Sequence, residues 1–134
     1  MSRIILDTSA YVVLLRGNKE LAEAIRESEE VVVNPIMIAE AIAGARNNKE
    51  RSLIEEELAK FRESPRVRIV PINEQTARCY AAIVGTLKLA GTMIPTNDIW
   101  IAASAMQYGL TVVTCDAHFR KVPQIICDYF KPVI

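Results

Sequence analysis

Four acidic residues stand apart from the mixed charge clusters that hold most other acids of this chain. Two of them come directly after short apolar runs: Asp7 follows residues 4–6, and Asp116 follows residues 111–115. In an open parallel sheet, ligands bind outside the carboxyl ends of the strands, and neighbouring strands lie about 4.8 Å apart. If these two strands are neighbours, the two carboxylates lie close together. The alternative is that each aspartate caps the helix or turn that follows it.

The other two acids lie on predicted helices that carry almost no further charge. Glu40 is the only charged residue between Pro35 and Ala45, and its neighbours on the helix face are apolar or small, which leaves room for a ligand. The alternative for Glu40 is simple exposure to solvent. Asp98 lies in the first turn of a helix that begins near Thr96, and we expect it at the inner edge of that helix. The alternative for Asp98 is favourable interaction with the helix dipole, which contributes about 0.3–1 kcal/mol.

These four residues are called the acidic quartet below, and together they predict a metal site. Two unit charges 4 Å apart repel by about 4 kcal/mol at an effective dielectric constant of 20. Protonation or a bound cation relieves such repulsion. Carboxylate oxygens suit Mg²⁺ or Mn²⁺ better than zinc, and the chain has one histidine, His118, and no closely spaced cysteine pair. A hard cation with open positions activates water and neutralises charge that develops on a phosphate, so the quartet predicts phosphoryl chemistry.

Short apolar strands alternate with helices along the chain. The predicted strands are residues 4–6, 31–33, 67–70, 111–114 and 124–127. The predicted helices are residues 10–15, 19–28, 36–46, 51–63, 73–91 and 96–108. This alternation is typical of crossover units around a parallel sheet with helices on both faces. We therefore predict an α/β, doubly wound fold, which would bring the strand ends and the following helix starts to one side of the sheet.

Composition narrows the class of protein. A length of 134 residues with 51% hydrophobic residues predicts a single domain over residues 1–134. Sixteen basic residues balance 16 acidic ones, which excludes a polybasic nucleic-acid binder. When the four acids of the quartet are set aside, 16 basic residues remain against 12 acidic ones. Three cysteines without a C-x-x-C pair favour a reducing compartment. With no apolar stretch suited to a secretory signal or a membrane helix, we expect a cytoplasmic protein that does not contact a membrane.

Four segments in this order resemble the PIN-domain family, and most closely the VapC-type ribonuclease toxins of toxin–antitoxin pairs. The segments read LDTSAYV around Asp7, IMIAEAIAG around Glu40, TNDIWIAASA around Asp98 and VVTCDAHF around Asp116. No single segment is specific, but their order and spacing span the chain from Asp7 to Phe119. The resemblance implies a three-layer α/β/α sandwich with a central, mostly parallel sheet of four to five strands. It also implies endoribonuclease activity that depends on Mg²⁺ or Mn²⁺, homodimers, and inhibition by a cognate antitoxin protein.

The same resemblance implies a role for each member of the quartet. Asp7 and Asp98 match the main metal ligands of the family, and Glu40 and Asp116 match the acids that complete the site. The polar residues that flank these acids match positions that orient them or the water: Thr8, Ser9, Asn97 and Thr114. Many relatives carry another acid shortly after the fourth aspartate, whereas this chain has Ala117 and His118 there. That departure bears on whether a second metal ion is held.

We therefore predict hydrolysis of RNA phosphodiester bonds by a metal-activated water that the acidic quartet holds. The alternative from another class is a non-catalytic PIN-like module that binds RNA or protein, and the complete quartet argues against it. A phosphatase with an aspartyl nucleophile is a further alternative. Such enzymes need a D-x-D motif, and Ser9 stands where the second aspartate belongs.

Overall fold

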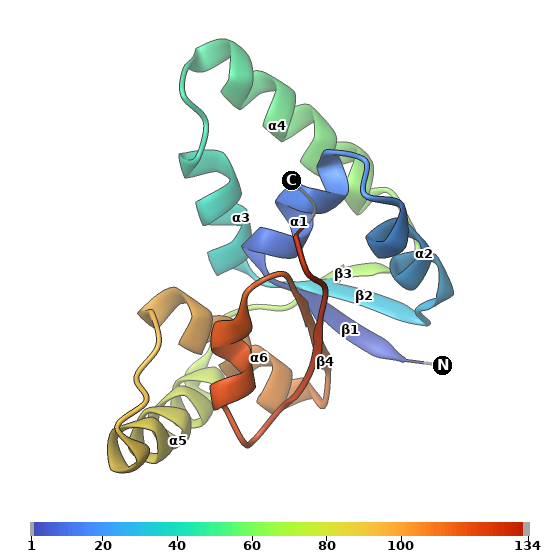
Figure 1. Ribbon diagram of the computed structural model, residues 1–134. Coiled ribbons are helices and arrows are strands. Elements are labelled where there is room, and N and C mark those ends of the chain that lie inside the picture. The colour runs from blue at the N-terminus through green and yellow to red at the C-terminus, as the bar shows by residue number, and fades with distance from the viewer. Residues whose placement is uncertain (1, 133–134) are drawn as a thin grey trace.

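The computed structural model describes residues 2–132 and contains a parallel sheet with the strand order β3-β2-β1-β4-β5 (Figure 1). The strands are β1 (Arg3–Leu6), β2 (Glu30–Val33), β3 (Val67–Ile69), β4 (Thr111–Thr114) and β5 (Ile126–Tyr129). Apart from the first residues of β1 and β2, Arg3 and Glu30, the three middle strands consist of β-branched and other apolar residues, as expected for strands that are covered on both faces. Residues that point in opposite directions from the pleat enter two separate apolar clusters, because side chains alternate along a strand.

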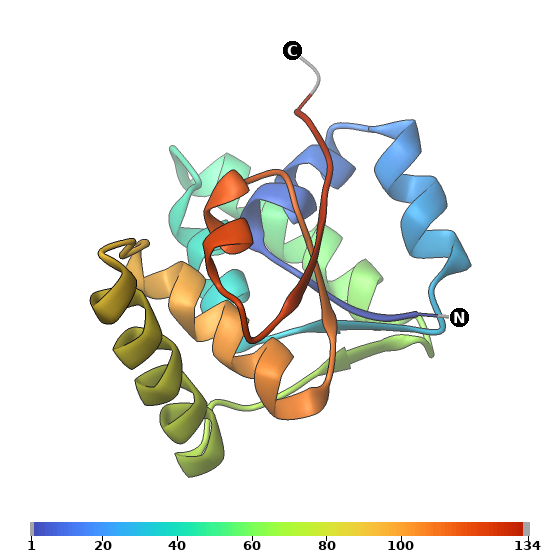
Figure 2. The same ribbon diagram turned by 60° about the horizontal axis from the view of Figure 1, so that its bottom comes forward.

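Helices cover both faces of this sheet (Figures 1 and 2). They are α1 (Thr8–Leu15), α2 (Lys19–Glu27), α3 (Pro35–Ala43), α4 (Asn48–Arg62), α5 (Glu74–Ala90) and α6 (Thr96–Tyr108). Buried residues of α1 to α4 form a cluster with one face of the sheet, and those of α5 and α6 form a cluster with the other face. The predicted α/β/α sandwich is therefore confirmed, with five strands in the described residues. No helix within those residues has the length and apolar character needed to cross a membrane.

The sequence prediction was wrong at several element boundaries. The last strand is Ile126–Tyr129 and not 124–127, and it pairs with β4 at the edge of the sheet, where Ile126 is 72% exposed. An edge strand with alternating exposure lacks the continuous apolar run by which we recognised the other strands. Helix α3 ends at Ala43 because Gly44 follows, and α4 begins at Asn48 because the Asn47 side chain accepts a hydrogen bond from the Glu50 backbone N–H.

The strand order places a topological switch point between β1 and β4. From β1 the sheet continues to β2 on one side and to β4 on the other, and all neighbouring pairs are parallel. Parallel doubly wound sheets form a crevice at this point, outside the carboxyl ends of the strands. Asp7 follows β1 and Asp116 lies two residues beyond β4, so both acids come from the two strands that border the switch point.

Candidate acidic metal site

Asp7 lies at the carboxyl end of β1 and is 2% exposed. Its Oδ1 accepts a hydrogen bond from the backbone N–H of Ala10 at 2.9 Å, so it caps α1. Its carboxylate also accepts hydrogen bonds from Ser9 Oγ at 2.8 Å and from Thr114 Oγ1 at 2.6 Å. The capping role and the position at the switch point are therefore not alternatives, because the same carboxylate has both.

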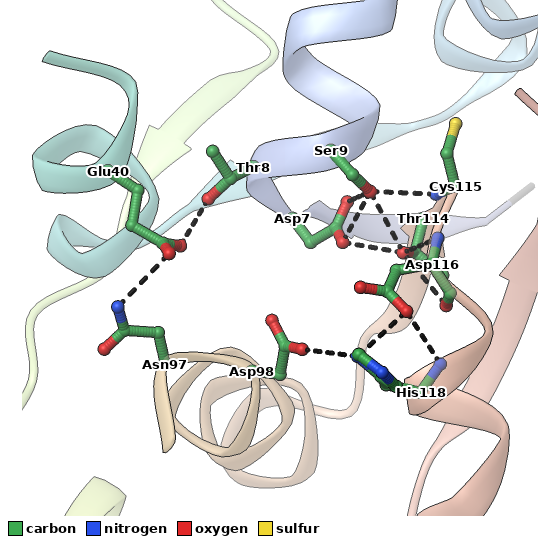
Figure 3. A network of polar contacts seen from close by, with 10 residues as sticks. All are labelled: Asp7, Thr8, Ser9, Glu40, Asn97, Asp98, Thr114, Cys115, Asp116 and His118. Carbon is green, nitrogen blue, oxygen red and sulfur yellow. Dashed lines mark hydrogen bonds and ion pairs between the residues drawn. The ribbon is translucent and has the colours of Figure 1, made fainter. Parts of the chain in front are cut away.

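Asp98 and Asp116 meet at the imidazole of His118 (Figure 3). Asp116 accepts a hydrogen bond from the backbone N–H of His118 at 2.9 Å and caps a short 3₁₀ helix, η1 (Ala117–Lys121). This turn brings the His118 ring back toward the site, where Nδ1 lies 3.0 Å from Asp116 Oδ1 and 3.2 Å from Asp98 Oδ2. Sequence reasoning missed this contact, although the D-A-H spacing after β4 is a signal for a capped turn that could have indicated it.

Glu40 is half-buried, and both of its carboxylate oxygens accept hydrogen bonds from the polar residues next to the other acids. Thr8 Oγ1 donates to Oε1 at 2.6 Å, and Asn97 Nδ2 donates to Oε2 at 3.1 Å. Thr8 follows Asp7 and Asn97 precedes Asp98, so these two bonds link α3 to the starts of α1 and α6. Figure 3 shows Glu40 on one side of a common space and His118 on the other, with Asp7 and Asp98 between them.

A buried asparagine fixes the two helices that carry Glu40 and Asp98. Asn34 is fully buried, and its Oδ1 accepts hydrogen bonds from the Ile36 and Met37 backbone N–H groups at the start of α3. Its Nδ2 donates to Ser104 Oγ of α6 at 3.0 Å. The Asn34 side chain therefore both caps α3 and sets the position of α3 against α6.

The structure thus brings three aspartates into mutual electrostatic contact and places Glu40 beside them. The pKa of Asp98 is raised to about 6, mainly by burial; the hydrogen bond with His118 lowers it, and the nearby charges of Asp116 and Asp7 contribute to the rise. Burial also raises the pKa of Asp7, against the hydrogen bonds from Thr114, Ala10 and Ser9. The protein therefore holds buried carboxylates whose charged forms are disfavoured, which is the electrostatic condition that a bound cation relieves.

The side chains present fit a divalent cation. One ligand atom each from Asp98, Asp116 and His118 lies within 4.8 Å of the other two. Asp7 is near enough to both aspartates for its charge to affect Asp98 and to be affected by Asp116. Glu40 is not part of this group of mutually close ligand atoms, so a role for it in holding the ion would be indirect.

The raised pKa of Asp98 predicts how stability depends on pH. A carboxyl whose pKa is higher in the folded state keeps its proton there while the unfolded chain releases it, so stability falls as pH rises between about 4 and 6. A rise from 3.8 to about 6 corresponds to about 3 kcal/mol of lost stability at neutral pH. We expect the free energy of unfolding of Asp98→Asn, relative to that of the parent protein, to rise by this amount between pH 4 and pH 7.5. Urea unfolding in EDTA measures it. A difference in free energy of unfolding that stays constant with pH would contradict this prediction.

Comparison with known proteins agrees with this arrangement. The chain is 33% identical to Ribonuclease VapC1 of Haemophilus influenzae (strain R2866) over 129 residues, which covers 92% of this chain and 91% of that protein. The structure of FitAcB from Neisseria gonorrhoeae superposes with a TM-score of 0.76 at 31% identity, covering 96% of this chain and 97% of the other. DNA-bound VapBC from Salmonella typhimurium has a TM-score of 0.83 at 23% identity, covering 96% and 98%, which is a likeness of fold.

The model of the PIN domain family matches residues 4–125. This match covers every member of the acidic quartet, all of β4, and all of β1 except Arg3. The chain therefore belongs to the PIN domain family.

Proposed function

We propose that this protein is a divalent-metal-dependent endoribonuclease, the toxin of a toxin–antitoxin pair. The observation that carries the proposal is the meeting of Asp7, Asp98 and Asp116 at the switch point of the sheet, in a chain whose relatives include a protein named Ribonuclease VapC1. An electronegative site of this kind binds a phosphate backbone only with a cation between them. The ion we propose is Mg²⁺ or Mn²⁺, since the acids offer oxygen ligands.

In the mechanism that we propose, Asp7 and Asp98 hold the ion and Asp116 completes the site. When bound, the ion lowers the pKa of a water molecule and neutralises charge on the phosphate that is attacked. Glu40 would orient the attacking water or accept its proton. Its two oxygens are fixed by Thr8 and Asn97, which keeps the carboxylate in one orientation and leaves further lone pairs for water. The resemblance to the family implies that cleavage leaves a 3′-hydroxyl and a 5′-phosphate.

The flanking polar residues have a positioning role in this proposal. Thr114 and Ser9 donate to the Asp7 carboxylate, and Thr114 Oγ1 also accepts a hydrogen bond from the Asp116 backbone N–H at 2.8 Å. One hydroxyl therefore sets the orientation of Asp7 and the backbone of Asp116 together. Fixed ligands lower the cost of assembling the site around an ion.

The partners that we propose follow from the relatives. A VapBC structure from Mycobacterium tuberculosis is described as a member of a family of toxin-antitoxin systems, and a relative from Neisseria gonorrhoeae is named Toxin FitB. We propose a cognate antitoxin protein and a homodimer for this chain, with RNA as the substrate. The cytoplasm is the compartment that agrees with such partners and with three free cysteines.

The test of this function is incubation of the purified protein with total RNA, in Mg²⁺ or Mn²⁺ and in EDTA, followed by mapping of new 5′ ends. We expect discrete cuts that bear 5′-phosphates and that EDTA abolishes. Absence of cleavage in both metals, together with retained RNA or protein binding, would instead indicate a non-catalytic module.

A further inference from the structure

The ring of His118 lies inside the acidic site, beside Asp98 and Asp116 (Figure 3). The Nδ1 atom lies 3.0 Å from Asp116 Oδ1 and 3.2 Å from Asp98 Oδ2. Adjacent ligands of an octahedral ion with bonds of about 2.1 Å are separated by about 3 Å. Both distances from Nδ1 therefore match the spacing of adjacent ligands around one ion as well as that of hydrogen-bond partners, and one ligand atom from each of the three residues lies within 4.8 Å of the others.

The backbone around His118 favours this position of the ring. Asp116 caps η1 by accepting a hydrogen bond from the His118 N–H. Phe119, in the same turn, is buried in the apolar cluster that contains residues of α5 and α6. His118 itself is 43% exposed, so water and ions reach its ring. The turn thus presents an imidazole nitrogen to the space between two carboxylates without burying it.

We propose that His118 is a direct ligand, through Nδ1, of the divalent ion held by Asp98 and Asp116, and that it makes this site prefer Mn²⁺ over Mg²⁺. Imidazole nitrogen suits first-row transition ions, whereas Mg²⁺ prefers oxygen ligands alone. For coordination the ring is neutral with its proton on Nε2, and Nδ1 gives its lone pair to the ion in place of the hydrogen bonds to the carboxylates.

This inference rests on the proposed function only for the existence of a metal site, and metal binding tests it without RNA. His118 is the sole histidine of the chain, so every imidazole signal of an untagged protein labelled with ¹⁵N-histidine belongs to this residue. We expect Mn²⁺ to broaden the Nδ1 resonance selectively and pulsed electron paramagnetic resonance to detect nitrogen coupled to Mn²⁺. At equal saturation, Mg²⁺ should change the chemical shift of the Nδ1 resonance much less than Zn²⁺, a diamagnetic ion that resembles the transition ions.

Calorimetry on the full chain separates a ligand from a residue that only orients its neighbours. His118→Asn retains a donor close to the position of Nδ1 but removes the imidazole, and it should lower Mn²⁺ affinity by roughly 10- to 100-fold with a much smaller loss for Mg²⁺. Lys121→Ala, in the same exposed turn, is the matched control and should change neither affinity. Equal losses for both ions, or no nitrogen coupling to Mn²⁺, would overturn the proposal.

The outcome of this experiment is independent of cleavage. If the protein cuts RNA but no nitrogen coupling appears, the nuclease stands and His118 is not a ligand. If nitrogen coupling appears and no RNA is cut, the ligand assignment stands and the proposed function fails.

Discussion

Asp98→Asn should slow divalent-metal-dependent RNA cleavage by roughly 10³-fold or more while the fold remains intact. The amide is the same size as the carboxylate but is neutral, so it binds a hard cation weakly. Removing a metal ligand forfeits several kcal/mol of transition-state stabilisation, and about 4 kcal/mol corresponds to this change in rate. Single-turnover cleavage of one RNA that the parent protein cuts, in Mn²⁺ and in Mg²⁺, measures the effect.

The fold is expected to tolerate this substitution because Asp98 accepts no backbone hydrogen bond at the start of α6. Its loss removes a favourable interaction with the helix dipole of at most about 1 kcal/mol and also removes a disfavoured buried charge. Asp128→Asn is the matched control, since Asp128 is an exposed acid of β5 away from the quartet. Parent-level cleavage by Asp98→Asn would show that our assignment of its role is wrong.

The sequence predicted the acids that follow strands better than it predicted their surroundings. Asp7 and Asp116 were recognisable because each ends an apolar run, and parallel strands bring such ends to one edge. Adjacency of β1 and β4 was not predictable, since it depends on how widely separated strands pair. Without that pairing, capping and ligand binding were separate alternatives for Asp7, whereas the structure assigns capping to it and places it beside the other aspartates.

Side chains that act across long sequence separations were the least predictable part of the site. For Glu40, the alternatives were exposure to solvent or contact with a partner. The hydrogen bonds from Thr8 and Asn97 decide between them, and these residues lie 32 and 57 positions away along the chain. From the sequence, His118 stood out only as the single histidine of the chain and as a departure from the family pattern. Its place between Asp98 and Asp116 depends on the 3₁₀ turn of η1, a short element without the apolar periodicity that indicates helices.

Asp7 should prove to be both a structural centre and a metal ligand, and two substitutions separate these roles. Asp7→Asn keeps an oxygen that can cap α1 and polar atoms that Ser9 and Thr114 can contact, but it removes the charge. We expect it to slow cleavage to the same extent as Asp98→Asn. Because burial raises the pKa of Asp7, the charged form is disfavoured in the fold, and the amide should be at least as stable as the parent at pH 7.5.

Asp7→Ala should be equally inactive but less stable than Asp7→Asn by about 2–3 kcal/mol. The alanine removes the cap of α1, which contributes about 1 kcal/mol, and leaves the buried Thr114 hydroxyl without its acceptor. Urea unfolding of the two variants in EDTA measures the difference in their free energies of unfolding. Because both side chains are neutral, the charge of Asp7 does not contribute to this difference. Equal stability would mean that the hydrogen bonds to Asp7 do not hold β1, α1 and β4 together. Retained cleavage in Asp7→Asn would mean that the carboxylate serves the fold alone, and that the ion is held by the remaining acids.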